Sequence, residues 1–399
     1  MKPRQNIPSR VTAETGDSEK QRWSYPSGLL AEISEQRAAL VWSAIAEGDD
    51  LDASRLIDRV GYAAALKVAQ EQDENFASPR ALQRWQGRLC DAQLGQLEHY
   101  LQLGFALVLR DQENWPKQLN DLGEKRPLCL WVKGNVQILQ RPMLAIVGSR
   151  DATSEGERSA LDLAYELAEK YVIVSGGAFG IDAQAHRGAI LANQATVIVS
   201  AAGVDRVYPK QNQEIFTRCV ENGGAIISES IPGASPQRYR FLLRNRIIAA
   251  LSTAVIVIEA GARSGALNTA RHALEIGREV GAFPGSVYCP QASGTNQLLR
   301  NGAMAVMNSL HVQELAGSIG SVQPELAVSD GEAGFLLPLD SPFDELADRV
   351  YDVLSKVKYE SAEQISRRVG ADFMSVRMKL SRLALAGKAQ MQDGKWRKA

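Results

Sequence analysis

Short apolar segments alternate with amphipathic ones through the middle of the chain. Each apolar segment has four or five residues, a length typical of a strand buried on both faces, and six occur: 143–147, 171–174, 196–200, 225–228, 254–258 and 280–283. The stretches between them have helical spacing, and the first begins with the capping box Ser154-Glu155-Gly156-Glu157. This alternation predicts an α/β fold with a doubly wound parallel sheet, whose ligands bind at the carboxyl ends of the strands.

The chain before this region divides into two parts. Residues 1–27 are mostly polar and cannot bury enough apolar surface to fold, so we predict a disordered leader. Residues 28–112 carry apolar side chains at helical spacing and are predicted to form a small helical, SAM-like domain. The predicted core then occupies residues 113–317, and an apolar and aromatic run within 115–135 indicates a further strand near its start.

The C-terminal part has its own pattern. Residues 318–342 are rich in Gly, Ser, Pro and acidic residues and are predicted to form a linker. Residues 343–399 show three helical segments, the second capped by Ser361-Ala362-Glu363-Gln364, and then a hairpin around Asp393-Gly394, which is the order of a winged helix. This segment has 12 Lys and Arg against 8 Asp and Glu. A winged-helix-like domain that contacts DNA and a helical module for protein contacts both stay open.

Composition narrows the classes of function. A net charge of −1 over 399 residues means that any nucleic-acid surface must be local. The four cysteines, which have no metal-like spacing, predict a reduced, cytoplasmic protein without structural metal: Cys90, Cys129, Cys219 and Cys289. We also expect no membrane association, because neither a secretory segment nor an apolar stretch of membrane-spanning length occurs.

Polar groups of one chemical kind follow five of the predicted strands. Most are cations, hydroxyls and amide donors, which suit phosphate better than metal ions. The glycine-rich turn 175–180 separates a strand from a helix, where backbone N–H groups could bind an anion, although a tight crossover would look the same. The candidate binding residues are Gly148, Ser149, Arg150, Ser175, Gly176, Gly177, Phe179, Gly180, Lys210, Asn212, Arg244, Asn245, Arg246, Ser264 and Gly265.

Aromatic residues lie among these loops, and a catalytic set does not. Phe179, Tyr208 and Phe241 could stack on bases of single-stranded nucleic acid or simply pack in the core. We predict structural or surface roles for the histidines, and turn or capping roles for two aspartates; these are His99, His186, His272, His311, Asp182 and Asp205. The sequence thus indicates a polyanion-binding protein rather than an enzyme, and no cofactor.

In this order, the core motifs resemble those of the DNA processing protein A (DprA/Smf) family. The resemblance covers residues 148–303 and, before them, the segment 115–135. It is carried by Gly148-Ser149-Arg150, Ser175-Gly176-Gly177, Gly180-Ile181-Asp182, Ala185-His186, the segment 203–212, Arg244-Asn245-Arg246-Ile247-Ile248-Ala249, Ser264-Gly265, Thr269-Ala270, Pro284-Gly285, Gly294-Thr295-Asn296 and Gly302-Ala303.

The resemblance implies an extended Rossmann-like core that binds single-stranded DNA without cutting it. It further implies protection of incoming DNA during natural transformation, loading of the RecA recombinase, and a binding surface that includes Arg150 and Lys210. A winged-helix-like C-terminal domain and a variable helical N-terminal domain also fit the family. The glycine motif of a helix-hairpin-helix is not evident, so the resemblance assigns no DNA contact to the N-terminal domain.

Two classes of enzyme are alternatives to a binding protein. A nucleoside-monophosphate phosphoribohydrolase has a related fold and carries a glutamate three residues after its glycine-rich loop, but here that loop corresponds to 265–269 and His272 takes the place of the carboxylate. A dinucleotide-dependent oxidoreductase needs Gly-x-Gly-x-x-Gly, whereas residues 175–180 are Ser-Gly-Gly-Ala-Phe-Gly.

Two structural expectations follow. Arg150 and Lys210 both follow strand ends, so we expect them to be exposed and to converge on one groove. The apolar run 303–310 comes after the last motif and predicts a homodimer through this end of the core, unless it is the last strand of the sheet.

Overall fold

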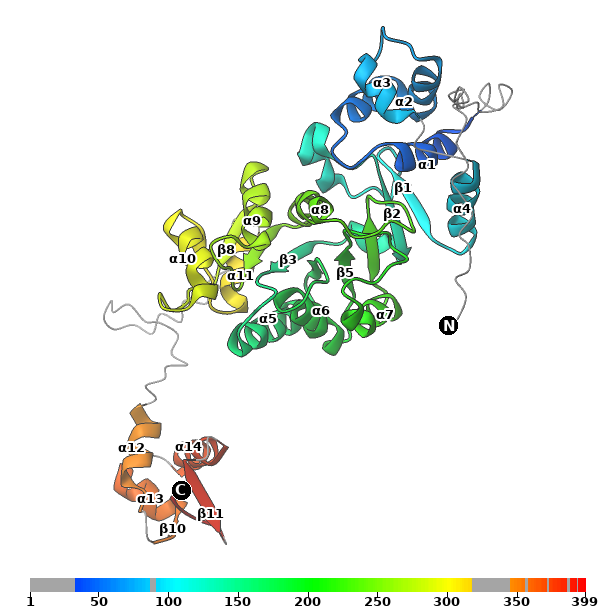
Figure 1. Ribbon diagram of the computed structural model, residues 1–399. Helices are drawn as coiled ribbons and strands as arrows, with labels where there is room; N and C mark the ends of the chain where they lie inside the picture. The colour runs from blue at the N-terminus through cyan, green and yellow to red at the C-terminus, as the bar shows by residue number, and fades with distance from the viewer. Residues whose placement is uncertain are drawn as a thin grey trace, which may run out of the picture. The chain divides into compact units, whose positions relative to one another are not determined.

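The chain forms two compact units, Met1–Gln323 and Pro324–Ala399, in the computed structural model of Figure 1. The structure describes residues 33–86, 91–317, 345–355, 358–371, 373–385, 388–392 and 394–399. The predicted leader, 1–27, and the predicted linker, 318–342, lie outside the described residues.

Between residues 33 and 102, the described chain forms four helices, which we call the helical region, before the sheet of the larger unit. Side chains of Ser34, Asp50 and Ser78 accept hydrogen bonds from the first turns of the first three helices and cap them. Trp42 and Trp85 pack edge to face at the centre, with ring centroids 5.0 Å apart. The helices are α1 (Glu35–Ile45), α2 (Leu51–Glu71), α3 (Pro79–Trp85) and α4 (Asp91–Gln102).

A nine-stranded sheet forms the middle of the larger unit, in the order β1-β2-β6-β5-β4-β3-β7-β8-β9. All strands from β6 to β9 in this order are parallel, and β2 pairs antiparallel with both β1 and β6. The α/β, doubly wound parallel sheet is therefore confirmed. Its strands are β1 (Ala106–Leu109), β2 (Cys129–Gly134), β3 (Met143–Val147), β4 (Val172–Ser175), β5 (Thr196–Val199), β6 (Ala225–Ser228), β7 (Ala254–Val257), β8 (Glu279–Ala282) and β9 (Met304–Ala305).

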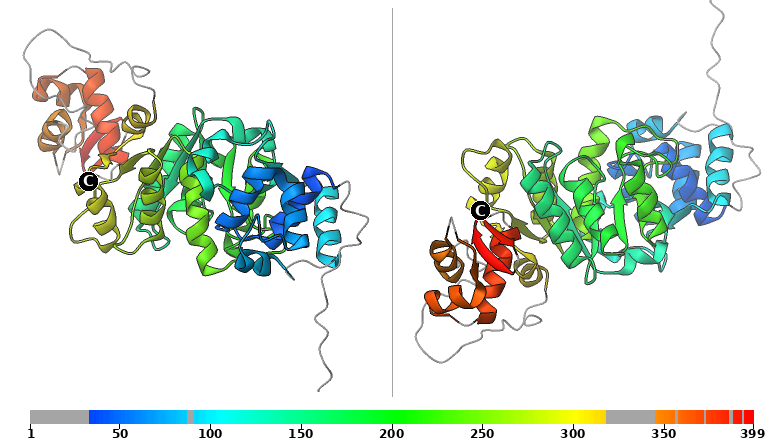
Figure 2. Two further views of the ribbon diagram at one scale, coloured as in Figure 1. Left: turned by 90° about the horizontal axis from the view of Figure 1, so that it is seen from above. Right: turned by 90° about the horizontal axis from the view of Figure 1, so that it is seen from below.

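Helices cover both faces of the sheet, because successive strand residues point to opposite sides. Leu144 and Ile146 pack with α5, α6 and α11, whereas Ala145 and Val147 pack with α8 and α9. α7 packs into the same apolar cluster as the helical region. Figure 2 shows the helical region at one end of the larger unit and α10 and α11 at the other. The helices are α5 (Ser154–Leu167), α6 (Ile181–Leu191), α7 (Gln213–Glu221), α8 (Arg238–Leu251), α9 (Gly265–Glu275), α10 (Ser293–Arg300) and α11 (Ser309–Ala316).

Two local predictions were wrong. Strand β1 lies within 28–112, the stretch expected to be helical throughout, because four apolar residues are too few for helical and strand spacing to be told apart. The cap of α5 is Thr153 rather than Ser154. Its hydroxyl accepts from the N–H of Gly156 at 3.0 Å and donates to the Glu259 carboxylate at 2.6 Å, so a distant loop fixes the start of this helix.

The apolar run 303–310 contributes a short strand and also exposed side chains. Met304–Ala305 is β9, which pairs with β8, so this part of the run is the last strand of the sheet. Met304, Met307 and Leu310 nevertheless expose 45%, 57% and 60% of their surface. An apolar surface therefore remains at this end of the sheet.

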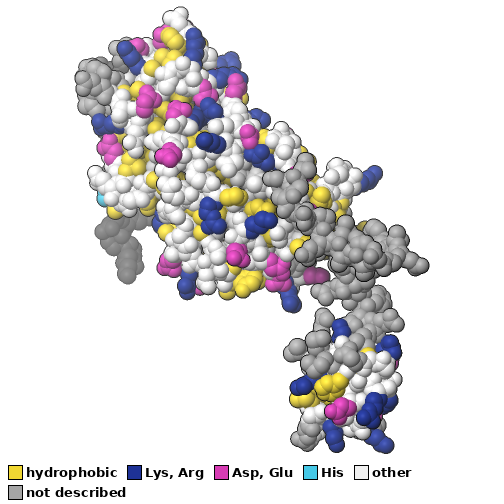
Figure 3. All heavy atoms as spheres, turned by 180° about the vertical axis from the view of Figure 1, so that it is seen from behind, with side chains coloured by type: hydrophobic (Ala, Val, Ile, Leu, Met, Phe, Trp, Pro, Cys, Tyr) yellow, Lys and Arg dark blue, Asp and Glu magenta, His cyan; other side chains and the backbone are white. Residues whose placement is uncertain are grey.

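The described residues of the smaller unit form three helices and a three-stranded antiparallel sheet of order β10-β12-β11. The predicted capping box of Ser361 and Gln364 is present at the start of its second helix. Trp396 packs with helical residues of one small core. Figure 3 shows several Lys and Arg side chains on the face of this unit that it displays. The elements are α12 (Glu345–Val353), β10 (Glu360–Ser361), α13 (Ala362–Val369), α14 (Phe373–Leu385), β11 (Ala389–Gln392) and β12 (Lys395–Lys398).

Candidate nucleic-acid interface

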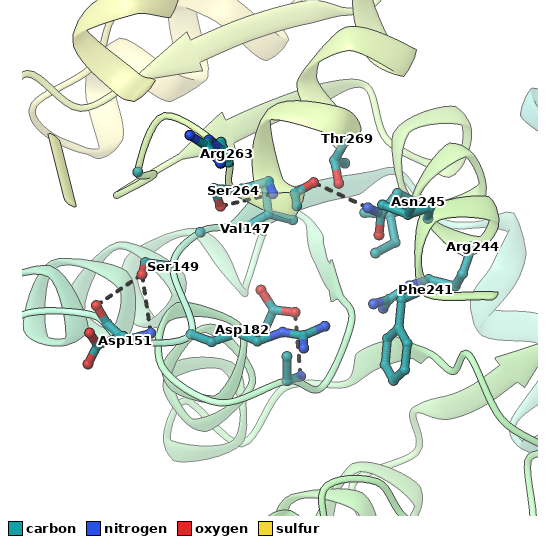
Figure 4. A pocket seen from close by; sticks show the side chains of 18 of the residues that line it. Val147, Ser149, Asp151, Asp182, Phe241, Arg244, Asn245, Arg263, Ser264 and Thr269 are labelled. Atoms are coloured by element: carbon teal, nitrogen blue, oxygen red, sulfur yellow. Dashed lines mark hydrogen bonds between the residues drawn. The ribbon is translucent and has the colours of Figure 1, made fainter. Parts of the chain in front are cut away.

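A cleft of about 560 Å³ lies at the carboxyl ends of β3 and β7. From β3 the chain builds the sheet outward through β4, β5 and β6, and α8 then returns it to β7 on the other side of β3. Ligands of open α/β sheets bind at such a reversal point. Figure 4 shows the cleft with Ser149 and Asp151 on one wall, Arg263 and Ser264 on a second, and side chains of α8 on a third.

The loop after β3 presents an exposed cation to this cleft. The N–H of Ser149 donates to the carbonyl of Glu259 at 2.7 Å, which ties the loop to the loop after β7. The Ser149 hydroxyl donates to the Asp151 carbonyl at 3.0 Å, so it holds the turn. The exposed Arg150 guanidinium lies 5.0 Å from the centre of the Phe241 ring. A cation in this position can attract a phosphate while its guanidinium rests against the ring.

Two aromatic rings extend this contact along the surface. The rings of Phe241 and Tyr208 are 5.6 Å apart and inclined by 55°. Arg150, Phe241 and Tyr208 therefore form a continuous row, which we call the aromatic ladder. Tyr208 and the nearby loop residue Phe179 expose 47% and 42% of their surface, too much for side chains that only pack a core. Exposed rings beside a cation can stack on bases.

The loop after β4 does not present its polar groups as the sequence suggested. Ser175 is buried and donates its hydroxyl to the Ile146 carbonyl at 2.7 Å. The N–H groups of Gly176 and Ala178 donate to the Asp182 carboxylate at 3.2 and 3.4 Å. The predicted turn role of Asp182 is confirmed, and this carboxylate occupies donors that we had expected to bind a ligand.

Two glycines of this loop are required by close approach rather than by phosphate contact. Gly180 has φ 67° and lies against the Ser149 carbonyl, where a Cβ atom would collide. A Cβ atom on Gly176 would collide with the Arg244 guanidinium. Gly177 is also buried, with φ 68°.

Lys210 and Asn212 separate into different roles. Asn212 is buried and donates to the carbonyls of Gly177 and Ala178, at 3.0 Å each, so it fastens the loop after β4. Lys210 is exposed, as predicted, but does not line the cleft. Tyr208 is the end of the aromatic ladder away from Arg150, and Lys210 follows it by two residues in the chain.

Helix α8 supplies the third wall, but its basic motif is buried. Arg244 donates to the Val199 carbonyl at 2.7 Å and is 4% exposed. Burial lowers its pKa to about 10, although the Asp182 charge opposes this effect, and burial raises the pKa of Asp182. Asn245 donates to the Gly265 carbonyl at 3.2 Å and thereby holds the start of α9. Arg244 and Asn245 line the cleft, but both side chains are buried.

Arg246 does not belong to the cleft, which corrects its assignment as a binding residue. It is 3% exposed and forms an ion pair with Glu229 at 2.7 Å. It also donates to the carbonyls of Lys125, at 2.8 Å, and Gly48, so it joins α8 to the helical region. Its chemistry is that of a buried structural cation with satisfied partners.

Two arginines outside the candidate binding residues line the cleft. Arg238 and Arg263 are both exposed, at the start of α8 and in the loop after β7. Ser264 accepts from the Ala266 N–H at 3.2 Å and caps α9, so the positive end of this helix faces the cleft with Gly265 exposed. Arg263 follows a strand end and could have been found by that rule, whereas Arg238 follows no strand.

The described part of the chain has neither a metal-binding cluster nor a membrane-spanning helix. It contains no group of three His, Cys, Asp or Glu side chains that could hold a metal ion. Within the same residues, no helix has both the length and the apolar content to cross a membrane. His186 is fully buried, and burial lowers its pKa to about 3, so it is neutral beside Thr196.

This chain is similar in sequence to known proteins over most of its length. A family model described as DNA recombination-mediator protein A matches residues 106–317. The DprA protein of Mycobacterium tuberculosis is 36% identical over 394 residues, which are 96% of this chain and 95% of that protein. Protein Smf of Escherichia coli is 34% identical and spans 70% of this chain and 74% of its own length.

The solved structure of DprA from Streptococcus pneumoniae gives a TM-score of 0.61 at 31% identity, covering 71% of this chain and 98% of that one. The parallel sheet, with its cleft at the reversal point between β3 and β7, thus defines a Rossmann-like binding core. The chain belongs to the DNA processing protein A (DprA/Smf) family of DNA recombination mediators.

Proposed function

We propose that this protein binds single-stranded DNA along the aromatic ladder and the cleft, without cutting it. The observation that carries the proposal is the ladder itself, where the Arg150 cation, the Phe241 ring and the exposed Tyr208 ring follow one another. Bases stack on rings regardless of sequence. Arg150, Arg238 and Arg263 in the cleft and Lys210 outside it attract the phosphates. The proposed contacts are thus sequence-tolerant, as a recombination mediator requires.

We further propose, from family membership, that the bound strand is protected and passed to the RecA recombinase in the cytoplasm. This step belongs to natural transformation and homologous recombination. Fluorescence anisotropy with single-stranded and double-stranded oligonucleotides tests the binding step, because only an unpaired strand offers its base faces to the ladder. Equal affinity for both forms at each salt concentration would contradict the proposal.

A phosphoribohydrolase is the alternative that the fold leaves open, and the site does not favour it. His272, at the position of the missing carboxylate, pairs with Glu275 at 3.2 Å and does not line the cleft. The buried carboxylate of the cleft, Asp182, is held by two N–H groups of its own loop. Incubation with nucleoside monophosphates should therefore release no free base.

We expect a homodimer through the surface that β9 and α11 expose. Met304, Met307 and Leu310 remain exposed there, and covering apolar side chains stabilises association. Light scattering at micromolar concentration should give twice the mass of the 43.4 kDa chain, and Met307→Asp with Leu310→Asp should reduce it to the monomer. A monomer in the unsubstituted protein would contradict this expectation.

Removal of residues 343–399 should weaken binding to duplex DNA more than binding to single strands. We infer that the smaller unit is a winged helix, since a helix–strand–helix–helix–strand–strand order with exposed cations suits a duplex groove. Arg377, Lys388 and Lys395 are exposed in it. Gel shifts of the full and shortened chains measure the difference, and unchanged duplex affinity would instead favour a module for protein contacts.

A further inference from the structure

The aromatic ladder is assembled from loops that are distant in the chain. Tyr208 lies in the loop after β5, and Phe241 lies in the first turn of α8, beyond β6. The contact between a ring on a loop and a ring on the first turn of a helix lasts only if both segments are held in place. The helical region reaches both of them.

The first contact runs from α4 to the loop that bears Tyr208. The Tyr100 hydroxyl donates to the Asp205 carboxylate at 3.2 Å. The other oxygen of this carboxylate accepts from the Gly233 N–H at 2.7 Å, which confirms the predicted turn role of Asp205. Burial and the neighbouring Asp205 charge raise the pKa of Tyr100, so its hydroxyl keeps the proton that it donates. The Tyr100 ring is itself stacked on Phe105, with centroids 5.3 Å apart.

The second contact runs from the segment between α1 and α2 to the start of α8. Glu47 forms an ion pair with Arg240 at 3.2 Å, directly before Phe241 in the chain. The Arg240 side chain is 16% exposed and also donates to the Ser235 carbonyl at 3.0 Å. The Gly48 carbonyl accepts from Arg246, six residues further along the same helix. The helical region thus fixes the end of α8 from which Phe241 projects.

We propose that Tyr100 and Glu47 are positioning residues for DNA binding, through which the helical region keeps the two halves of the aromatic ladder together. Neither residue lines the cleft. They act by raising the fraction of molecules in which Tyr208 and Phe241 are in contact, and affinity scales with that fraction. The proposal rests on the proposed function, because the ladder must be the surface that binds the strand.

The test compares Tyr100→Phe, Glu47→Gln and the double variant with the full-length wild type. Anisotropy with oligo-dT should show that the double variant binds about three to tenfold more weakly, as expected when two such contacts no longer favour the competent state. The slope of log K against log salt should not change, because no phosphate contact is removed. Amide hydrogen exchange should become faster in segments 203–212 and 235–246.

Arg55→Ala is the matched control. Arg55 forms an exposed ion pair with Glu124 at 2.7 Å, which also links the helical region to the core but involves neither Tyr100 nor Arg240. This variant should bind the oligonucleotide like the wild type.

Three outcomes would overturn the proposal while the wild type still binds single strands. They are unchanged affinity in the double variant, an equal loss in Arg55→Ala, and tighter binding with a steeper salt slope in Glu47→Gln, which would mean that Glu47 masks a phosphate-binding Arg240. If the wild type itself does not bind oligo-dT, the proposed function fails instead.

Discussion

Phe241→Ala is expected to weaken binding to single-stranded DNA by about tenfold or more. Phe241 contacts both neighbours in the aromatic ladder, Arg150 at 5.0 Å and Tyr208 at 5.6 Å. Its removal takes away one stacking surface, a loss of about 1 to 3 kcal/mol per base, and also frees the Arg150 side chain. Anisotropy with oligo-dT at fixed salt measures this loss.

Phe241→Trp is the control for Phe241→Ala, because it keeps a ring at this position and should retain most of the affinity. Wild-type affinity in the alanine variant would show that Phe241 only covers the start of α8. A comparable loss in the tryptophan variant would point to a packing defect instead of lost stacking.

Arg246→Ala is expected to lower the free energy of unfolding by about 3 to 5 kcal/mol, the cost of leaving a buried charge without its partner. Glu229, whose side chain is 11% exposed, would lose its cation, and the Lys125 and Gly48 carbonyls would lose a donor. Urea unfolding measures the change.

The control for Arg246→Ala is Arg158→Ala, which breaks an exposed pair with Asp162 on α5 and should cost less than about 1 kcal/mol. We predict that Arg246→Ala, under conditions where it is folded, keeps the wild-type slope of log K against log salt for DNA binding. If the variant has near-wild-type stability and a flatter slope of log K against log salt, Arg246 contacts DNA after all.

The sheet could be predicted from the sequence because its strands are buried on both faces. Six short apolar runs each became a parallel strand, and the position of the cleft followed from the rule for strand ends. The strand β1 was missed because Ala106–Leu109 is too short to show a period. Residue type and spacing are therefore enough to predict most of the strands and their order along the chain.

Burial of the polar loop residues could not be predicted in the same way. Ser175, Asn212 and Arg246 have the side chains of ligand donors, and their actual partners are carbonyls and a carboxylate from other segments of the chain. Such partners meet only in the folded molecule. The contact between Arg150, in the loop after β3, and Phe241, in the first turn of α8, is equally absent from any local pattern.

We propose that Arg150, which lines the cleft, and Lys210, which is exposed outside it, each neutralise a phosphate of a bound single strand. The most direct measurement is the slope of log K against log salt for oligo-dT, in the wild type and in Arg150→Ala with Lys210→Ala. Both side chains are exposed, so the variant should stay folded by circular dichroism. The control is Arg141→Ala with Lys170→Ala. It removes two exposed cations that precede β3 and β4, at the amino ends of these strands and so away from the cleft.

The account predicts that the Arg150 and Lys210 variant binds more weakly and that its slope is flatter by about 1.4, at about 0.7 for each lost phosphate contact, while the control keeps the wild-type slope. A folded variant with wild-type affinity and wild-type slope would contradict the account, because the strand would then bind elsewhere on the protein.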